Sequence, residues 1–216
     1  MPPPRSSPRI HPLGDAAALV DLGRRLDTAL NTRCLHLAAA LRKHHAVREA
    51  IAGYASVVVH YDPEQISFRG LSAAVRRLAG LRARAAPVGR LHRIPVAYDG
   101  PDLEATADAL KLEVRELVRL HTAPYYRVFM VGFVPGWAYL GPLDPRLELP
   151  RRRVPRTSVP AGSVAIAGLQ TGVYPLPTPG GWHLIGTTSV PMFLPQSDPP
   201  SLLRPGDRVR FFASAG

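Results

Sequence analysis

The sequence predicts an α+β chain with a small ferredoxin-like α+β domain followed by a β-barrel domain. In the first half, two stretches with helical apolar spacing alternate with short apolar strand-like runs. From about residue 125 onward, glycines and prolines interrupt short apolar runs every few residues, which is typical of short strands joined by tight turns. A chain of 216 residues with 46% apolar residues is long enough for two small domains.

The first domain is predicted over residues 9–98, after a disordered Pro-rich tail over residues 1–8. Gly14-Asp15 separates two short apolar runs, which indicates a hairpin. Asp27 is expected to cap a helix that runs to about His44. The apolar positions that recur at helical spacing in this stretch are Leu30, Cys34, Leu37 and Leu41.

Two strands are predicted next, over residues 47–54 and 56–61. Asp62-Pro63 is expected to open a second helix that ends near Leu81, and residues 90–98 are predicted to add a last strand. The order β-α-β-β-α-β, with an extra strand from the N-terminal hairpin, is the ferredoxin-like arrangement.

Residues 99–124 are predicted to form a connector of two short helices, about 102–110 and 114–120, so that the domain boundary lies between Tyr98 and Tyr125. The second domain is predicted over residues 125–216. It closes with the turn Pro205-Gly206-Asp207 and a last strand, Arg208 to Phe212.

The composition restricts the class of protein. The net charge of +11 comes almost entirely from arginine, yet no RNP-like aromatic motif, Cys/His finger or helix-turn-helix accompanies it, so no specific nucleic-acid partner is expected. No apolar run reaches the roughly 20 residues that a membrane span needs. The N-terminus lacks the apolar segment of a signal peptide.

The single cysteine, Cys34, excludes an internal disulfide and is expected to be a buried, inert thiol. Together these features predict a cytoplasmic protein without a membrane partner.

Familiar catalytic motifs are missing. The sequence has no G-x-x-x-x-G-K-[ST] phosphate loop and no H-E-x-x-H zinc motif, and Ser163 is not in a G-x-S-x-G elbow. We therefore expect no metal site and no tightly bound cofactor. Arg156, stiffened by Pro155, could bind an anion, and His121 or His183 could transfer protons near neutral pH. For Arg151, Arg152 and Arg153 a solvated loop is the favoured interpretation.

Four ordered motifs carry a resemblance: GFVPGWAYL, PRRRVPR, VPAGSVAIAG-Q-TGVYP and TPGGWHLIG. In this order and spacing they resemble the KipI/PxpB family, and the resemblance extends over nearly the whole chain. It implies a cyclophilin-like C-terminal barrel and a second cyclophilin-like subunit of the KipA/PxpC type. With a PxpA-like protein, that pair would form an ATP-dependent 5-oxoprolinase that opens 5-oxoproline to glutamate. The cofactor implied by the resemblance is ATP together with Mg.

The resemblance implies that this chain is the PxpB-type component and is inactive alone. The residues expected to bind substrate or nucleotide are Arg156, Gln170, Thr171, Pro179, Gly180, Gly181, Trp182 and Thr188. His183 or His121 is expected to be the acid/base, and the amides of Gly180 and Gly181 are expected to bind an oxyanion or phosphate. Because neighbours on a strand face opposite sides, we expect His183 in the pocket and Trp182 in the core.

Two alternatives remain open from the sequence. One is a KipI-type inhibitor that docks on a histidine kinase. The other is a component of a biotin-dependent carboxyltransferase, in a urea and allophanate pathway. A neighbouring sensor-kinase gene would favour the first, and a biotin-carrier gene the second.

Overall fold

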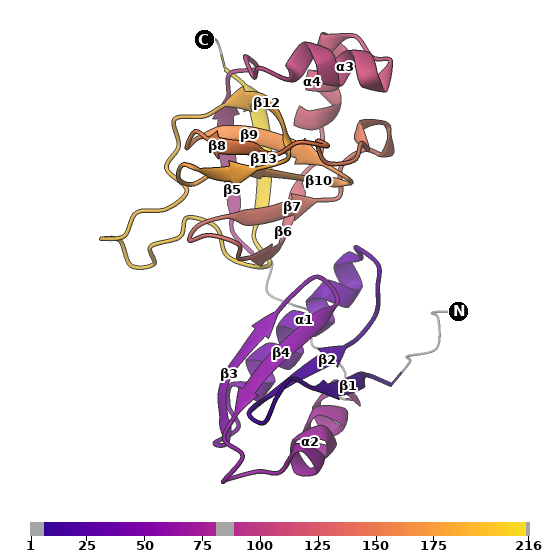
Figure 1. Ribbon diagram of the computed structural model, residues 1–216, viewed down its shortest axis with the longest axis vertical. Coiled ribbons are helices and arrows are strands. Elements are labelled where there is room, and N and C mark those ends of the chain that lie inside the picture. The colour runs from indigo at the N-terminus through magenta and orange to yellow at the C-terminus, as the bar shows by residue number, and fades with distance from the viewer. Residues whose placement is uncertain (1–6, 81–88, 215–216) are drawn as a thin grey trace. The chain divides into compact units, whose positions relative to one another are not determined.

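The computed structural model describes residues 7–80 and 89–214, and the chain divides into two compact units, Met1–Pro87 and Val88–Gly216. Figure 1 shows the first unit in indigo to purple and the second in magenta to yellow. The predicted tail over residues 1–8 lies largely outside the described residues. Each unit has its own buried apolar core.

The N-terminal unit is a four-stranded antiparallel sheet with two helices. Its elements are β1 (Arg9–Pro12), β2 (Ala17–Asp21), α1 (Thr28–Leu41), β3 (Val47–Ala52), β4 (Ser56–Tyr61) and α2 (Phe68–Gly80). The strand order is β1-β2-β4-β3. The predicted hairpin is confirmed, with Gly14 in the left-handed region at a φ of 65°.

Helix α1 forms where the sequence predicts it. The Asp27 carboxylate accepts a hydrogen bond from the backbone N–H of Leu30 at 2.7 Å, which caps the helix. Cys34 is fully buried, as predicted, and burial raises the pKa of its thiol to about 12. Helix α2 begins at Phe68, later than predicted, because the Asp62 carboxylate instead caps a turn by accepting from the backbone N–H of Glu64.

The strand predicted to close the first domain belongs to the second one. β5 (Leu91–Val96) pairs in parallel with β13 (Arg208–Ala213), from Arg208 opposite Leu91 to Ala213 opposite Val96. Both edges of β2 are already occupied, by β1 and by β4, so no edge beside β2 remains for β5. The predicted β-α-β-β-α-β domain over residues 9–98 is therefore wrong in its last strand.

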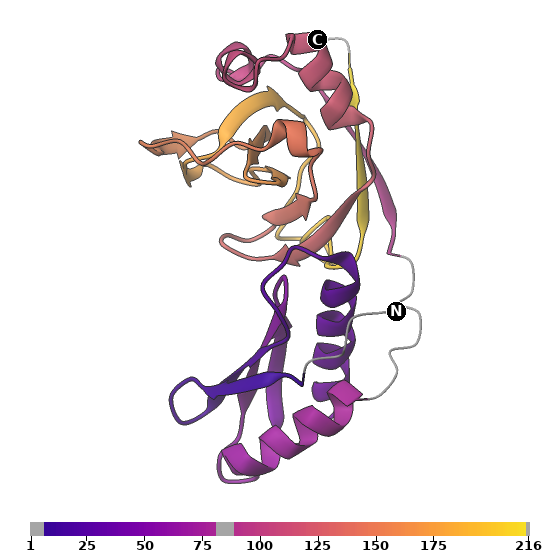
Figure 2. The same ribbon diagram turned by 90° about the vertical axis from the view of Figure 1, so that its right-hand side faces the viewer.

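The C-terminal unit is a nearly closed mixed β-barrel. Its further elements are α3 (Leu103–Leu110), α4 (Val114–Thr122), β6 (Tyr126–Val131), β7 (Ala138–Gly141), η1 (Pro145–Leu147), β8 (Arg156–Val159), β9 (Ser163–Ala167), β10 (Gln170–Val173), β11 (Thr178–Gly180) and β12 (His183–Thr187). The seven-stranded sheet has the order β12-β9-β10-β7-β6-β13-β5. A bridge between Ala97 and Thr187 joins its two ends and curls the sheet into the barrel seen in Figure 2. β8 and β11 form a separate pair.

Helices α3 and α4 are part of this barrel unit and not a connector between domains. Leu103 and Ala107 of α3, with Leu117 and Leu120 of α4, lie in the same core cluster as Phe211 of β13. Both helices therefore cover apolar residues of the barrel. Within the described ranges, no helix is long and apolar enough to cross a bilayer.

Candidate functional site

The barrel unit has a cavity of about 320 Å³ whose lining includes five aromatic side chains. Its lining residues are Phe133, Trp137, Tyr139, Arg151, Pro155, Tyr174, Thr178, Pro179, Gly180, Gly181 and Trp182. A small cavity with apolar walls and few polar groups is a typical place for a small-molecule ligand.

Trp137 is the centre of the aromatic wall. Its ring lies edge-to-face against Tyr174 with centroids 4.6 Å apart, and against Trp182 with centroids 5.1 Å apart. Tyr139 contacts both tryptophans in the same manner. Edge-to-face packing fixes the orientation of each ring, so the wall has a defined shape before any ligand arrives.

Phe133 lies at the cavity in an unusual backbone conformation. Its φ is 83°, which a bulky side chain rarely adopts, and its side chain is 63% exposed. The turn is held by the N–H of Gly132 bound to the carbonyl of Trp137, and by the N–H of Trp137 bound to the carbonyl of Val134. A strained turn that presents an exposed aromatic ring is a feature that concentrates at binding sites.

The Pro-Gly-Gly-Trp segment forms another part of the wall. Gly180 pairs with Arg156 where β11 meets β8. A Cβ on Gly180 would lie 2.1 Å from the Tyr174 hydroxyl oxygen, so only glycine permits this close approach. Burial raises the pKa of Tyr174, which therefore stays protonated at neutral pH.

Arg151 contributes the charged group of the lining, and a buried carboxylate holds the loop that carries it. Asp102, just before α3, is 5% exposed and accepts two hydrogen bonds from Arg156, each at 2.8 Å, and one from Arg152 at 2.7 Å. The N–H of Arg152 also binds the carbonyl of Gly181 at 2.8 Å. Arg151 itself is exposed and has no ion-pair partner among the described residues.

The protonation state of Asp102 follows from these contacts. Burial alone would raise its pKa, but hydrogen bonds from Arg156 and from the backbone N–H of Leu184, with the charges of both arginines, lower it. Asp102 is therefore ionised at neutral pH. The guanidinium of Arg156, expected to bind an anionic ligand, is bidentate to this carboxylate.

His121 and Thr171 lie in the barrel core, away from the cavity lining. Thr171 donates its only hydroxyl hydrogen to the carbonyl of Ala165 at 3.0 Å, so it accepts from Nε2–H of His121 at 2.9 Å. Nδ1 of His121 is then the acceptor for the hydroxyl of Tyr98 at 2.7 Å. Burial lowers the pKa of His121 to about 3, so this imidazole is neutral and both nitrogens are engaged.

Of the remaining predicted residues, only Trp182 is in the cavity lining. Nε2 of His183 is 2.9 Å from the carbonyl oxygen of Pro150. Trp182, expected in the core, is both 5% exposed and part of the cavity wall. Gln170 begins β10, and the N–H of Thr188 binds the carbonyl of Gly162. The cavity thus brings together only four of the predicted residues: Pro179, Gly180, Gly181 and Trp182.

Sequence reasoning missed most of the aromatic wall and the Asp102 anchor. Trp137 and Phe133 lie within the glycine- and proline-rich GFVPGW motif, which is a usable signal. Asp102 has no such signal, because it is separated by 50 residues from Arg152 and by 54 from Arg156.

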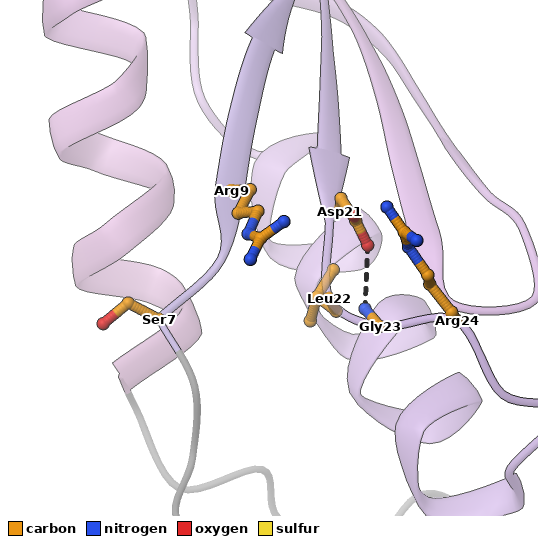
Figure 3. Close-up of a pocket in the computed structure, with 6 residues that line it drawn as sticks. All are labelled: Ser7, Arg9, Asp21, Leu22, Gly23 and Arg24. Atoms are coloured by element: carbon orange, nitrogen blue, oxygen red, sulfur yellow. Dashed lines mark hydrogen bonds between the residues drawn. The ribbon is translucent and has the colours of Figure 1, made fainter.

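A second cavity, of about 340 Å³, lies in the N-terminal unit (Figure 3). Figure 3 shows the Asp21 carboxylate between the side chains of Arg9 and Arg24, and Asp21 accepts from the N–H of Gly23 at 2.9 Å. The Asp21 carboxylate offsets part of the positive charge of Arg9 and Arg24, and this wall contains no aromatic side chain among the described residues. The aromatic cavity is therefore the stronger candidate site.

Comparisons with known sequences agree with the resemblance. The family model for the carboxyltransferase domain, subdomain C and D, matches residues 8–203. The B component of the 5-oxoprolinase of Bacillus subtilis (strain 168) is 41% identical in an alignment 220 residues long. The alignment covers 94% of this chain and 91% of that protein. The corresponding 5-oxoprolinase component of Escherichia coli O157:H7 is 42% identical over 207 residues, with 94% of both chains covered.

Solved structures show the same fold in longer chains. TTHA0988 superposes with a TM-score of 0.82 at 42% identity, over 93% of this chain, which spans only 40% of TTHA0988. The urea carboxylase of Kluyveromyces lactis superposes with a TM-score of 0.79 over 96% of this chain and 22% of its own, but at 20% identity, which shows the fold alone. The chain belongs to the carboxyltransferase domain family, subdomain C and D, and within it to the KipI/PxpB family.

Proposed function

We propose that this chain is the PxpB-type component of an ATP-dependent 5-oxoprolinase-like complex, and that the aromatic cavity binds 5-oxoproline. The observation that carries the proposal is a rigid aromatic cavity whose lining includes one charged side chain, Arg151, without an ion-pair partner among the described residues. The names of the relatives that are 41% and 42% identical support the same activity.

The chemistry of 5-oxoproline suits this cavity. The compound is a small lactam ring with one carboxylate, so its ring can pack against the aromatic lining, in which Phe133 is 63% exposed. The carboxylate can pair with Arg151, whose guanidinium binds such groups bidentately. A volume of about 320 Å³ is ample for one such molecule.

We place no step of nucleotide chemistry on this chain. The sequence has no glycine-rich phosphate loop, and no group of three His, Cys, Asp or Glu side chains within the described ranges could hold a metal ion. ATP, and the Mg that accompanies it, would therefore bind mainly through other subunits. The cavity would hold the substrate for them.

The partners in this proposal are a KipA/PxpC-like second subunit and a PxpA-like protein. The relatives are each named as one component of a 5-oxoprolinase, which supports the presence of further subunits. The match covers 40% of TTHA0988, so the other 60% of that chain (100% minus 40%) is joined to the matched region. A protein related to that remainder would be the second subunit.

The decisive experiment is to co-express the three proteins of one genome, purify the complex and measure ATP hydrolysis with and without 5-oxoproline. We expect phosphate release that depends on 5-oxoproline, and none from this chain alone. ATP hydrolysis that 5-oxoproline leaves unchanged, in an intact complex, would contradict the proposed function.

A carboxyltransferase component is the second candidate, favoured by the description of the matching family. In that case the cavity would accept a planar carboxyl acceptor. Adding a carboxylated biotin carrier to the same complex distinguishes the two, because only a carboxyltransferase would discharge it.

A further inference from the structure

We infer that the outer face of β5 and β13, together with Tyr125, is the surface on which the second subunit docks, through an acidic patch of its own. We name it the arginine–aromatic face, formed by Leu91, Arg93, Tyr125, Arg208, Arg210 and Phe212. The inference rests on the proposed function in one respect, because it takes the second subunit as the occupant.

The strand register places these side chains on one side of the sheet. Arg208 lies opposite Leu91, and Arg210 lies opposite Arg93. Side chains that are paired across a sheet point to the same face, and alternate residues point to the opposite one. The alternate residues Ile94, Val209 and Phe211 are buried in the barrel core, so the face that contains Arg93 points outward.

No helix of the described part of the C-terminal unit covers this side of β5 and β13 in Figure 2. Three large apolar side chains are exposed on it: Leu91 is 43% exposed, Tyr125 53% and Phe212 38%. Clustered exposed apolar side chains are a feature of interaction surfaces, whereas isolated ones are ordinary.

Aromatic rings hold the arginines in place. The guanidinium of Arg93 lies over Phe212, 5.6 Å from the ring centroid, and those of Arg208 and Arg210 lie 5.9 and 5.1 Å from the centroid of Tyr125. Arg210 also donates to the Tyr125 hydroxyl at 3.2 Å. Such stacking orders long side chains before binding, which reduces the entropy that binding would otherwise cost.

The charge of the face indicates the chemistry of its partner. Arg93, Arg208 and Arg210 form no ion pair with any described residue, although other arginines of the chain do. Three ordered guanidiniums without a carboxylate partner leave their outward N–H groups available for carboxylates. Arginine, tyrosine and phenylalanine together are also the composition enriched in protein interfaces.

A protein partner fits this face better than a nucleic acid. Stacking of bases needs free ring faces, whereas Tyr125 has two guanidiniums over it and Phe212 has one. Leu91 adds an aliphatic contact that a phosphate backbone would not use. An acidic protein surface with apolar residues at its centre satisfies both the charge and the apolar groups.

The test is the affinity of the full chain for the purified KipA/PxpC-type protein of the same genome, measured by calorimetry. The variant is Arg93→Glu with Arg208→Glu. The matched control is Arg69→Glu with Arg76→Glu, which reverses two exposed arginines of α2 and changes net charge equally. We expect the face variant to bind roughly 30-fold more weakly and the control to change by less than about threefold.

Salt and a second variant complete the test. Wild-type affinity should fall between about 50 and about 300 mM NaCl, and the face variant should lose most of that dependence. Tyr125→Ala, which removes the ring under two arginines, should also weaken binding, and unchanged melting temperatures would show that the variants fold.

Three results would overturn the inference. Equal binding of the face variant and the wild type would place the interface elsewhere, while 5-oxoproline-dependent ATP hydrolysis by the complex would leave the proposed function intact. If the wild type does not bind the second subunit at all, this subunit is not the partner of the face, and the proposed complex is contradicted as well. If the face variant loses binding to a single-stranded oligonucleotide that the wild type binds, while its affinity for the second subunit is unchanged, the face is a nucleic-acid site.

Discussion

Arg156 binds Asp102 through two hydrogen bonds of 2.8 Å, although 54 positions separate the two residues in the chain. The pair joins the start of α3 to β8, and the Leu184 N–H adds β12 to the same carboxylate. Because Arg152 binds it as well, Asp102 holds the loop that brings Arg151 to the aromatic cavity. It is a positioning residue for the candidate site.

Replacing Asp102 by asparagine should destabilise the protein by about 2 kcal/mol at neutral pH, because two guanidiniums lose their charged partner. The lowered pKa of Asp102 means that this stabilisation is present above the unfolded-state value of about 4 and is lost as pH falls through the folded value. Urea unfolding of both proteins at several pH values measures the effect.

The wild type and Asp102→Asn should therefore converge in stability at acidic pH. Asp108→Asn, an exposed carboxylate on α3, is the control and should be nearly neutral. A gap between wild type and Asp102→Asn that stays constant down to the acid transition would refute the assigned ion pair.

His121 should make the protein less stable in mild acid. Its folded pKa of about 3 lies below the unfolded value of about 6.5, so between these values the unfolded chain binds a proton that the folded chain does not. Stability is full above about pH 6.5 and falls as the pH decreases through this window. Melting temperatures should show a shallower slope for His121→Gln than for the wild type, and His60→Gln, exposed on β4, should keep the wild-type slope. A wild-type slope in His121→Gln would mean that His121 is not the titrating group.

Gly180→Ala should destabilise the barrel unit by roughly 1–3 kcal/mol, because the new methyl group overlaps the hydroxyl of a buried tyrosine, Tyr174. Gly80→Ala is the matched control, since a Cβ there meets no atom within 4 Å. It should be neutral. Thermal unfolding followed by far-UV circular dichroism checks both, and equal stability of the two variants would contradict the close packing at Gly180.

Arg151 and His183 can be separated by kinetics of the assembled complex. Arg151→Gln should raise KM for 5-oxoproline by ~10-fold or more, the cost of losing a charged hydrogen-bond partner for the carboxylate. Arg153→Gln, two positions away and outside the lining, should leave KM unchanged within about threefold.

His183→Ala should change kcat by less than about tenfold, because its Nε2 lies at the Pro150 carbonyl and outside the cavity lining. A loss of ~100-fold or more at constant KM would instead support the acid/base role expected from the sequence.

Local signals of the sequence determined most elements and the family. The Asp27 cap, the helical spacing of Leu37 and Leu41 in α1, and the Gly14 turn act between near neighbours in the chain, so the sequence alone is enough to predict them. The sequence also predicts the Pro-Gly-Gly-Trp segment as part of a site, and in the structure this segment lines the aromatic cavity, whose function stays a proposal.

Tertiary structure decided which strand edges pair and which polar side chains are buried. The sequence predicts β5 as the last strand of the first domain, but β5 pairs with β13, more than a hundred positions later. In a ferredoxin-like domain β5 would pair with β2, and here β1 occupies that edge of β2. His121 looked like a proton donor, yet the packing of α4 against β10 and β13 buries it and keeps it neutral. Strand partners, burial and ion pairs depend on contacts between segments that are distant in the chain. The spacing of residues along the sequence does not predict those contacts.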